Sequence, residues 1–261
     1  MPRIGSLGVV VALVLLLGIG AQPQRALSAT AVTTTTQTIA IPSYFYPGPL
    51  WSQMERAHPP VGLAIINPNS GPGAALNEDY VSQVRHSQSA GLVVLGYVHT
   101  SWGARSADEV RTEIDEYYSW YHVDGIFFDE ASTDCADVAP YYGPLNSYVK
   151  AKGGQALTVI NPGTATDECY MSAADIVVTF EGPYSKYRSG YSAPSWVANY
   201  SASRFWHLIY ATSTTKRMKR AIGLSKQRGA GWVYVTPDGG TNPWDTLPSG
   251  SYWKRELAAV G

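Results

Sequence analysis

The segment from Asp124 to Glu130 reads DGIFFDE, a short apolar run that ends in two adjacent carboxylic acids. An apolar run of this length, without polar alternation, is typical of a parallel strand that is buried on both faces. The two acids therefore stand where such a strand leaves its sheet, the position at which α/β barrels carry their chemistry. A purely structural interpretation competes, because the helix dipole also favours acids at the start of a helix.

A second strand-like run ends in the same way. Asp175 to Gly182 reads DIVVTFEG, which places Glu181 after another apolar, β-branched run. Two strands that terminate in acids predict a paired-carboxylate site made of Asp129, Glu130 and Glu181.

Similar runs recur along the chain, with helical stretches between them. The expected strands are Thr38 to Tyr46, Val61 to Asn67, Leu92 to Thr100, Gly125 to Glu130, Ala156 to Asn161, Ile176 to Glu181, His207 to Ala211 and Gly231 to Thr236. The expected helices are Asn77 to Ala90, Ser106 to His122, Tyr142 to Lys152 and Thr214 to Gln227. This alternation predicts a single-domain α/β protein, a (β/α)8 TIM-type barrel. A doubly wound open sheet competes, but no glycine-rich phosphate loop follows the first strand.

Residues 1–31 have the layout of a secretory signal peptide, with Arg3, an uncharged run from Leu7 to Ala21, and then small and polar residues. The run is shorter than the roughly 18 to 20 apolar residues that a spanning helix needs, so we expect cleavage near residues 29–32 and no stable membrane insertion. Residues 32–40 would form a short leader and residues 41–261 the barrel. We expect a secreted, extracellular monomer.

Charge and histidine spacing exclude several classes of partner. The formal net charge is −1 and no basic block is apparent, which argues against nucleic-acid binding. The five histidines show no HxH or HExxH spacing, so we expect neither a metal nor another cofactor. Cys135 and Cys169 lack CxxC or Cys-His spacing, and in an exported protein they favour a disulfide between neighbouring loops.

Aromatic and polar groups near strand ends are suited to sugar binding. The chain contains 18 Tyr and 8 Trp but only 5 Phe, and Tyr and Trp combine a flat apolar face with a hydrogen-bonding edge. Amides can hold sugar hydroxyls or an acetamido group. The expected substrate-binding residues are Tyr44, Asn67, Tyr97, His99, Asn161, Trp232 and Tyr234. Each also has a structural interpretation, because Asn before Pro often only shapes a turn.

With these residues in place, the chain resembles the spherulin 4 family, which includes fungal glycoside hydrolases that act on galactosaminogalactan. The similarity appears in order along most of the mature chain, in INPNSGPG (66–73), GYVHTSWGAR (96–105), DGIFFDE (124–130), NPGT (161–164) and Phe180-Glu181. The resemblance implies a (β/α)8 barrel and an endo-acting α-1,4-N-acetylgalactosaminidase of biofilm exopolysaccharide, with catalytic carboxylates at Asp129, Glu130 and Glu181. Trp102 departs from the Tyr or Phe expected before Gly103, a change that keeps an aromatic face.

Glycoside hydrolysis divides the work between two carboxyl groups. Our hypothesis from the sequence is that Glu130 is the general acid/base, Glu181 the nucleophile or stabiliser, and Asp129 a neighbour that tunes charge or orients an acetamido group. Neighbours on an extended strand point to opposite faces, so Asp129 and Glu130 share one cleft only if the strand breaks between them. Crowding of three carboxylates should raise at least one pKa.

Two rival functions remain at this level. The first is a secreted carbohydrate-binding or cell-surface barrel without turnover. The second is a metal-dependent hydrolase, which would ordinarily place histidines beside the acids.

Overall fold

The computed structural model describes residues 1–2 and 36–261, and Thr35–Gly261 forms one unit. The expected signal peptide and the first residues of the leader therefore lie outside the described residues. Strand β1 (Thr38–Pro42) begins inside the segment 32–40 that the sequence assigns to the leader, because Ile39 and Ala40 are fully buried apolar residues of the barrel. The expected boundary at residue 41 is corrected accordingly: the barrel starts at Thr38.

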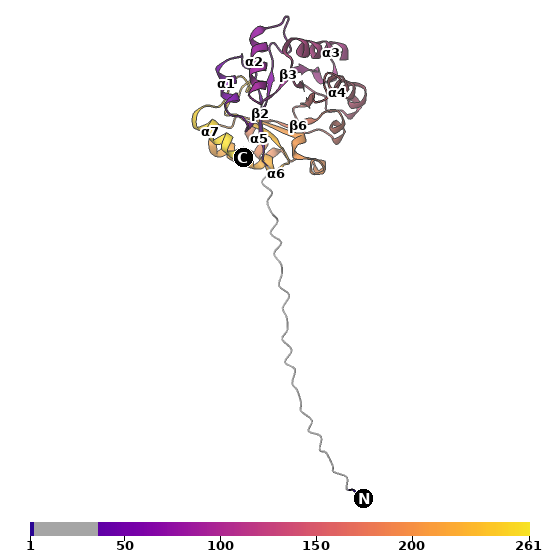
Figure 1. Ribbon diagram of the computed structural model, residues 1–261, viewed down its shortest axis with the longest axis vertical. Helices are drawn as coiled ribbons and strands as arrows, with labels where there is room; N and C mark the ends of the chain where they lie inside the picture. The colour runs from indigo at the N-terminus through magenta and orange to yellow at the C-terminus, as the bar shows by residue number, and fades with distance from the viewer. Residues whose placement is uncertain (3–35) are drawn as a thin grey trace. The chain divides into compact units, whose positions relative to one another are not determined.

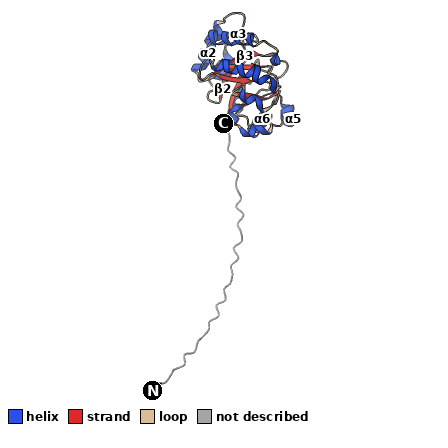
Figure 2. Cartoon of the chain, turned by 90° about the vertical axis from the view of Figure 1, so that its right-hand side faces the viewer, coloured by secondary structure: helices blue, strands red, loops and turns tan. Residues whose placement is uncertain are grey.

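The eight strands close into a parallel barrel in which each strand pairs with the next in sequence and β8 pairs with β1. Figures 1 and 2 show strands in the interior of this unit and helices on its outside. The pairing of β1 with β8 excludes the open doubly wound sheet and confirms the predicted fold class. All eight predicted strands are present, with bounds β1 Thr38–Pro42, β2 Val61–Ile66, β3 Val93–His99, β4 Gly125–Asp129, β5 Leu157–Ile160, β6 Ile176–Pro183, β7 Phe205–Tyr210 and β8 Trp232–Val235.

Helices surround the barrel (Figure 2), with bounds α1 Pro49–Glu55, α2 Glu78–Ser89, α3 Ala107–Glu116, α4 Gly143–Lys150, α5 Tyr184–Gly190, α6 Thr215–Gln227 and α7 Gly250–Val260. The four predicted helices correspond to α2, α3, α4 and α6. The start of α3 follows the predicted capping box: Ser106 Oγ accepts from the backbone N–H of Glu109, and the Glu109 side chain accepts from the backbone N–H of Ser106. Helices α1, α5 and α7 escaped prediction; α1 and α5 are seven residues long, too short for a periodic pattern.

Apolar side chains fill both faces of the strands. Phe127 on β4 and Trp206 on β7 belong to strands that are not paired with each other, yet their ring centroids lie 5.7 Å apart inside the barrel. Burial of side chains of this size contributes on the order of 1.5–3 kcal/mol each. Gly125 opens β4 where a Cβ atom would clash with the backbone of Leu157 on β5, so strand packing requires a glycine at this position of the quoted segment.

Candidate active site

Strand β4 delivers two acids to the cleft because it breaks between them. Asp129 is the last residue of β4 and pairs with His99 on β3. Glu130 has a left-handed backbone conformation, with φ of 49°. This conformation is uncommon outside glycine, and it turns the second carboxylate back toward the opening of the barrel. The break that the sequence required for Asp129 and Glu130 to share one cleft is therefore present.

The left-handed residue is held by hydrogen bonds to its carbonyl oxygen. The backbone N–H of Trp102 donates to the Glu130 carbonyl at 2.6 Å, and the Thr100 hydroxyl donates to the same oxygen at 2.8 Å. The Tyr142 hydroxyl lies 3.0 Å from Thr100 Oγ1 and accepts from the backbone N–H of Ser132 at 2.7 Å. A left-handed non-glycine residue costs about 1–3 kcal/mol, and this network offsets that cost.

In strand β6 a β-bulge places Glu181 in the cleft. In the pairing with β7, Val178 lies opposite Trp206 and Phe180 lies opposite His207, so one extra residue is inserted between them. Without that insertion, alternation would turn Glu181 toward the surrounding helices. With it, Phe180 packs outward against Tyr187 of α5, and Glu181 lines the cleft.

Asn161, which follows β5, connects the acids from the two strands. Its side-chain Nδ2 donates to Asp129 Oδ1 at 2.8 Å and to Glu181 Oε2 at 2.6 Å. Its Oδ1 accepts from the backbone N–H of Gly163 at 2.9 Å, which fixes the orientation of the amide. Because one nitrogen reaches both carboxylates, these two oxygens are closer than the roughly 6.5 Å at which inverting pairs begin, and they suit the ~5–5.5 Å of retaining pairs.

Trp244 holds the other oxygen of Glu181 and was not predicted from the sequence. Its indole Nε1 donates to Glu181 Oε1 at 3.2 Å from the loop after β8. The available signal was the pair Asn242-Pro243, the third Asn-Pro that follows a strand, after Asn67-Pro68 and Asn161-Pro162. The cleft also includes Tyr210, at the end of β7, which the sequence did not single out.

Burial controls the charge of the two bridged acids. Desolvation is the main cause that raises the pKa of Glu181 to about 7, and the charge of Asp129 adds to it; Asn161 and Trp244 oppose the rise by hydrogen bonding. Desolvation also raises the pKa of Asp129, while hydrogen bonds from Tyr97 and Asn161 lower it. The pKa of an acid in the cleft is therefore raised as expected, but burial raises it more than the neighbouring carboxylates do.

Two adjoining cavities form the cleft at the carboxyl ends of the strands. The outer one measures about 320 Å³ and contains Trp102 and Glu130 at its rim. The inner one measures about 370 Å³ and reaches Tyr97 and Phe127 in the barrel. Both include Asp129, Asn161 and Glu181, so the bridged acids lie where the two cavities meet.

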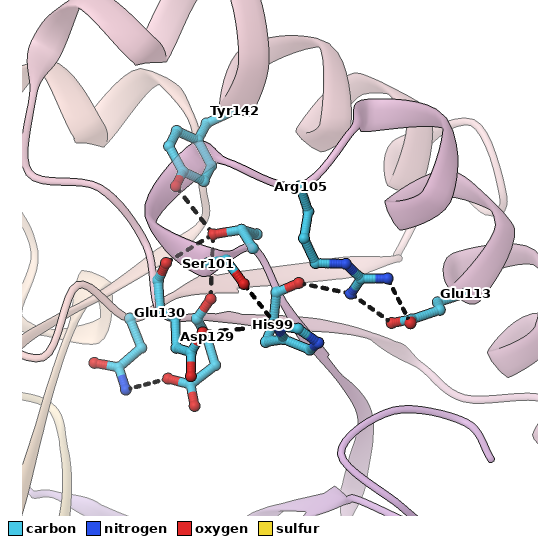
Figure 3. Close-up of polar contacts among 9 residues, drawn as sticks. His99, Ser101, Arg105, Glu113, Asp129, Glu130 and Tyr142 are labelled. Atoms are coloured by element: carbon cyan, nitrogen blue, oxygen red, sulfur yellow. Dashed lines mark hydrogen bonds and ion pairs between the residues drawn. The ribbon is translucent and has the colours of Figure 1, made fainter.

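Five of the seven predicted substrate-binding residues lie at this cleft. Tyr44, Asn67, Tyr97 and Asn161 line the inner cavity, with the rings of Tyr44 and Tyr97 edge to face at 5.4 Å. His99 lies beside the rim, where its Nδ1 is 3.6 Å from Glu130 Oε2 and 3.2 Å from the hydroxyl of Ser101 (Figure 3).

The other two predicted residues do not line the cleft. Trp232 is the first residue of β8, at the amino end of the barrel, and its indole donates to the Ser203 carbonyl. Tyr234 is fully buried and packs against Trp244 at 5.9 Å, so it supports the indole that binds Glu181. Trp232 stands near the start of its strand, which is the end of a parallel strand that lies away from the cleft.

The predicted disulfide joins Cys135 and Cys169. It connects the segment after β4 to the segment before β6, and therefore ties together the loops that follow Glu130 and Asn161. A cross-link of this kind restricts the unfolded chain and the loops around the cleft.

Within residues 36–261 and the first two residues, no helix is long and apolar enough to cross a membrane. Across the same described part of the chain, no group of three or more His, Cys, Asp or Glu side chains has the arrangement of a metal site.

Comparisons with known proteins agree with this geometry. The model of the family described as Spherulation-specific family 4 matches residues 38–260. Spherulin-4 from Physarum polycephalum is 34% identical over 246 residues, which cover 88% of this chain and 72% of that protein.

Among solved structures, Aspergillus clavatus Sph3 in complex with GalNAc is 28% identical, with a TM-score of 0.74 over 87% of this chain and 98% of that chain. A putative α-galactosidase from Bacteroides fragilis is 10% identical, with a TM-score of 0.53 over 87% of this chain and 60% of that chain. The second likeness concerns the fold alone.

Proposed function

The chain belongs to spherulation-specific family 4, and from that premise we propose that it is an endo-acting glycoside hydrolase of a galactosamine-containing polysaccharide. The observation that carries the proposal is the pair of carboxylates, Asp129 and Glu181, that Asn161 bridges inside an open cleft. The similar Sph3 is bound to GalNAc, which supports N-acetylgalactosamine as the sugar recognised here.

Glu181 is the better proton donor of the pair. Its pKa of about 7 keeps a large fraction protonated near neutral pH, which a general acid requires. Each of its oxygens accepts one N–H, from Asn161 or Trp244, and retains a second lone pair that can carry the proton. This assignment differs from the sequence-based hypothesis, in which Glu130 was the general acid/base and Glu181 the nucleophile or stabiliser.

Asp129 then acts as the nucleophile. In the first step its carboxylate attacks the anomeric carbon while Glu181 protonates the leaving glycosidic oxygen, and a covalent glycosyl ester forms. In the second step Glu181 removes a proton from water, which attacks the same carbon and releases Asp129. In an α-linked N-acetylgalactosamine the 2-acetamido group lies on the same face as the leaving oxygen. It cannot attack from behind, so a protein carboxylate is needed.

Glu130 has a different role in this proposal. Its side chain is 37% exposed at the rim, beside His99 and the exposed indole of Trp102. A carboxylate and an aromatic face in this position bind the hydroxyls and the apolar face of a neighbouring sugar unit. Glu130 would therefore bind and orient the polymer, while Tyr44, Asn67 and Tyr97 bind the sugar in the inner cavity.

The protein would work outside the cell as a monomer. The sequence of residues 1–31 supports export, and the Cys135–Cys169 disulfide fits an oxidising compartment. An exported enzyme of this type would act on exopolysaccharide, such as the galactosaminogalactan of a biofilm.

A digestion screen tests the proposal. The mature protein is incubated with acetylated and deacetylated α-1,4-galactosamine polymers and with chitin oligomers, and products are sized by mass spectrometry. We expect oligosaccharides, rather than single sugars, from the acetylated galactosamine polymer. Binding of that polymer without any new reducing ends would contradict the proposal and favour a carbohydrate-binding barrel. Activity that a chelator abolishes and a divalent ion restores would favour a metal-dependent hydrolase.

A further inference from the structure

Positive charge is concentrated in one part of the chain. Between Gly182 and Pro237 there are nine of the 19 Lys and Arg residues and none of the 20 Asp and Glu residues. Four of the nine fall within TKRMKR (215–220), at the start of α6. This segment corrects the statement that the sequence has no basic block; the nearly neutral total conceals it.

The fold gathers these charges around a groove between α5 and α6. Two cavities of about 320 and 370 Å³ adjoin there and share Tyr184, Arg188 and Arg217 in their walls. The second is also lined by Thr214, Lys216 and Arg220. All four cationic side chains are exposed to solvent. We call the surface formed by Arg188, Lys216, Arg217 and Arg220 the basic groove.

No acid neutralises the groove. Among the described residues, none of its four cations forms an ion pair with a carboxylate. Arg217 donates to the Ser213 hydroxyl at 3.1 Å and lies 5.8 Å above the Tyr184 ring. The adjacent helix α7 adds another cation, because Arg255 donates to the hydroxyl of Thr215 at 3.3 Å.

Two acids that follow β8 in sequence, Asp238 and Glu256, accept hydrogen bonds from backbone N–H groups. The Asp238 side chain accepts from the backbone N–H of Gly239. The Glu256 side chain on α7 is fully buried and accepts from the backbone N–H of Val235. The four exposed cations of the groove therefore remain available to an anionic ligand.

The basic groove begins beside the active site. Tyr184 opens α5 directly after β6, the strand that holds Glu181. Ala211 lines the groove's first cavity, and the preceding residue, Tyr210, lines the outer cavity of the cleft. A polymer that leaves the cleft over the end of β7 reaches the groove next.

We propose that the basic groove binds the acidic groups of an anionic glycan. Guanidinium groups pair with carboxylate, sulfate or phosphate through two parallel hydrogen bonds, and three of the four cations here are arginines. A glycan is favoured over nucleic acid because the groove continues from the sugar cleft and because Tyr184, its aromatic residue, is buried rather than available for base stacking. The inference rests on the proposed function only in taking the polymer in the cleft to be a glycan, and it goes further: N-acetylgalactosamine units carry no acid, so the groove binds acidic substituents or acidic units of a mixed glycan.

Binding measurements on two matched double variants test the inference. Lys216→Ser/Arg220→Ser removes two exposed cations of the groove that make no side-chain hydrogen bond or ion pair within the described residues. Arg56→Ser/Arg85→Ser removes two exposed cations near α1 and on α2 and changes the net charge equally. The probes are fluorescent oligogalacturonate, dextran sulfate, neutral dextran and a single-stranded oligonucleotide, at an ionic strength of about 50 mM, where screening is weak.

We expect the wild type to bind oligogalacturonate or dextran sulfate and not neutral dextran. The groove variant should bind the acidic glycan about tenfold or more weakly, since each exposed ion pair contributes up to ~1 kcal/mol, and the Arg56/Arg85 control should bind like the wild type. The inference is overturned if neither acidic glycan binds, if both variants lose affinity equally, or if the oligonucleotide binds more tightly than both glycans. Hydrolysis is measured separately. If the groove binds an acidic glycan but the protein cleaves no polymer, only the proposed function is contradicted.

Discussion

Two glutamates with raised pKa values, the half-buried Glu181 and the fully buried Glu256, have different surroundings. Desolvation raises the pKa of Glu181 to about 7 and that of Glu256 to about 8. Glu181 receives N–H groups from Asn161 and Trp244 and lines both cavities of the cleft. Glu256 receives one N–H, from Val235, is fully buried on α7, and its Oε2 has no partner among the described residues.

These two glutamates show that a raised pKa does not by itself make an acid catalytic. Burial alone raises the pKa of Glu256, which has no access to substrate. Glu181 adds the features that catalysis requires: an open cavity, a second carboxylate in Asp129, and an amide that sets the spacing between them. Replacement of Glu181 is therefore expected to affect turnover, and replacement of Glu256 to affect folding.

The largest expected effect concerns activity. Glu181→Gln should lower kcat/KM for the acetylated polymer roughly 10²- to 10⁴-fold, because the amide has no acidic proton to transfer. Glu256→Gln should leave kcat/KM close to wild type. Reducing-end assays on both purified variants give the comparison.

Circular dichroism on both variants provides the control for folding. If Glu256→Gln lost as much activity as Glu181→Gln while remaining folded, the two glutamates would not differ as proposed.

A smaller effect concerns the pH dependence of stability. An unfolded chain loses the Glu256 proton near the ordinary pKa of 4.5, whereas the folded chain keeps it up to about 8. Between these values folding takes up a proton, so the free energy of unfolding falls as pH rises, by roughly 1.4 kcal/mol per pH unit for one such group. Glu256→Gln should remove this part of the decline. Urea unfolding between pH 4.5 and 8 measures it.

Glu181→Gln should also reduce the fall of the free energy of unfolding with pH. The affected pH range is narrower, because the pKa of Glu181 in the folded protein is about 7 rather than 8. A decline as steep in the Glu256→Gln variant as in the wild type would show that Glu256 does not hold its proton in the folded state.

The sequence predicted the barrel well because parallel strands carry a local signal. Runs such as VGLAII (61–66) and IVVTF (176–180) are continuous and apolar, and their alternation with helical stretches leaves few other folds. Helices α1 and α5 lack that signal, because in a seven-residue helix tertiary packing outweighs pattern.

The three acids were also visible in the sequence, but their roles depend on features that it does not display. The bulge in β6 turns Glu181 into the cleft, and no residue type in VVTFEG announces it. The bridge from Asn161 depends on how side chains of the neighbouring strands β4, β5 and β6 are oriented, and the indole of Trp244 comes from a loop 63 residues beyond Glu181. The position of Trp232 was visible in the sequence, because this residue stands near the start of the predicted strand 231–236, whereas parallel strands present their carboxyl ends to the cleft.

The stereochemistry of cleavage tests the central claim most directly, because it depends on the spacing of Asp129 and Glu181. Proton NMR of the first product released from an α-1,4-linked N-acetylgalactosamine oligomer distinguishes its two anomers before they equilibrate. A bridged pair at retaining distance, with Asp129 as nucleophile, predicts that the α-anomer appears first. Initial release of the β-anomer would mean direct attack by water and would contradict the assignment.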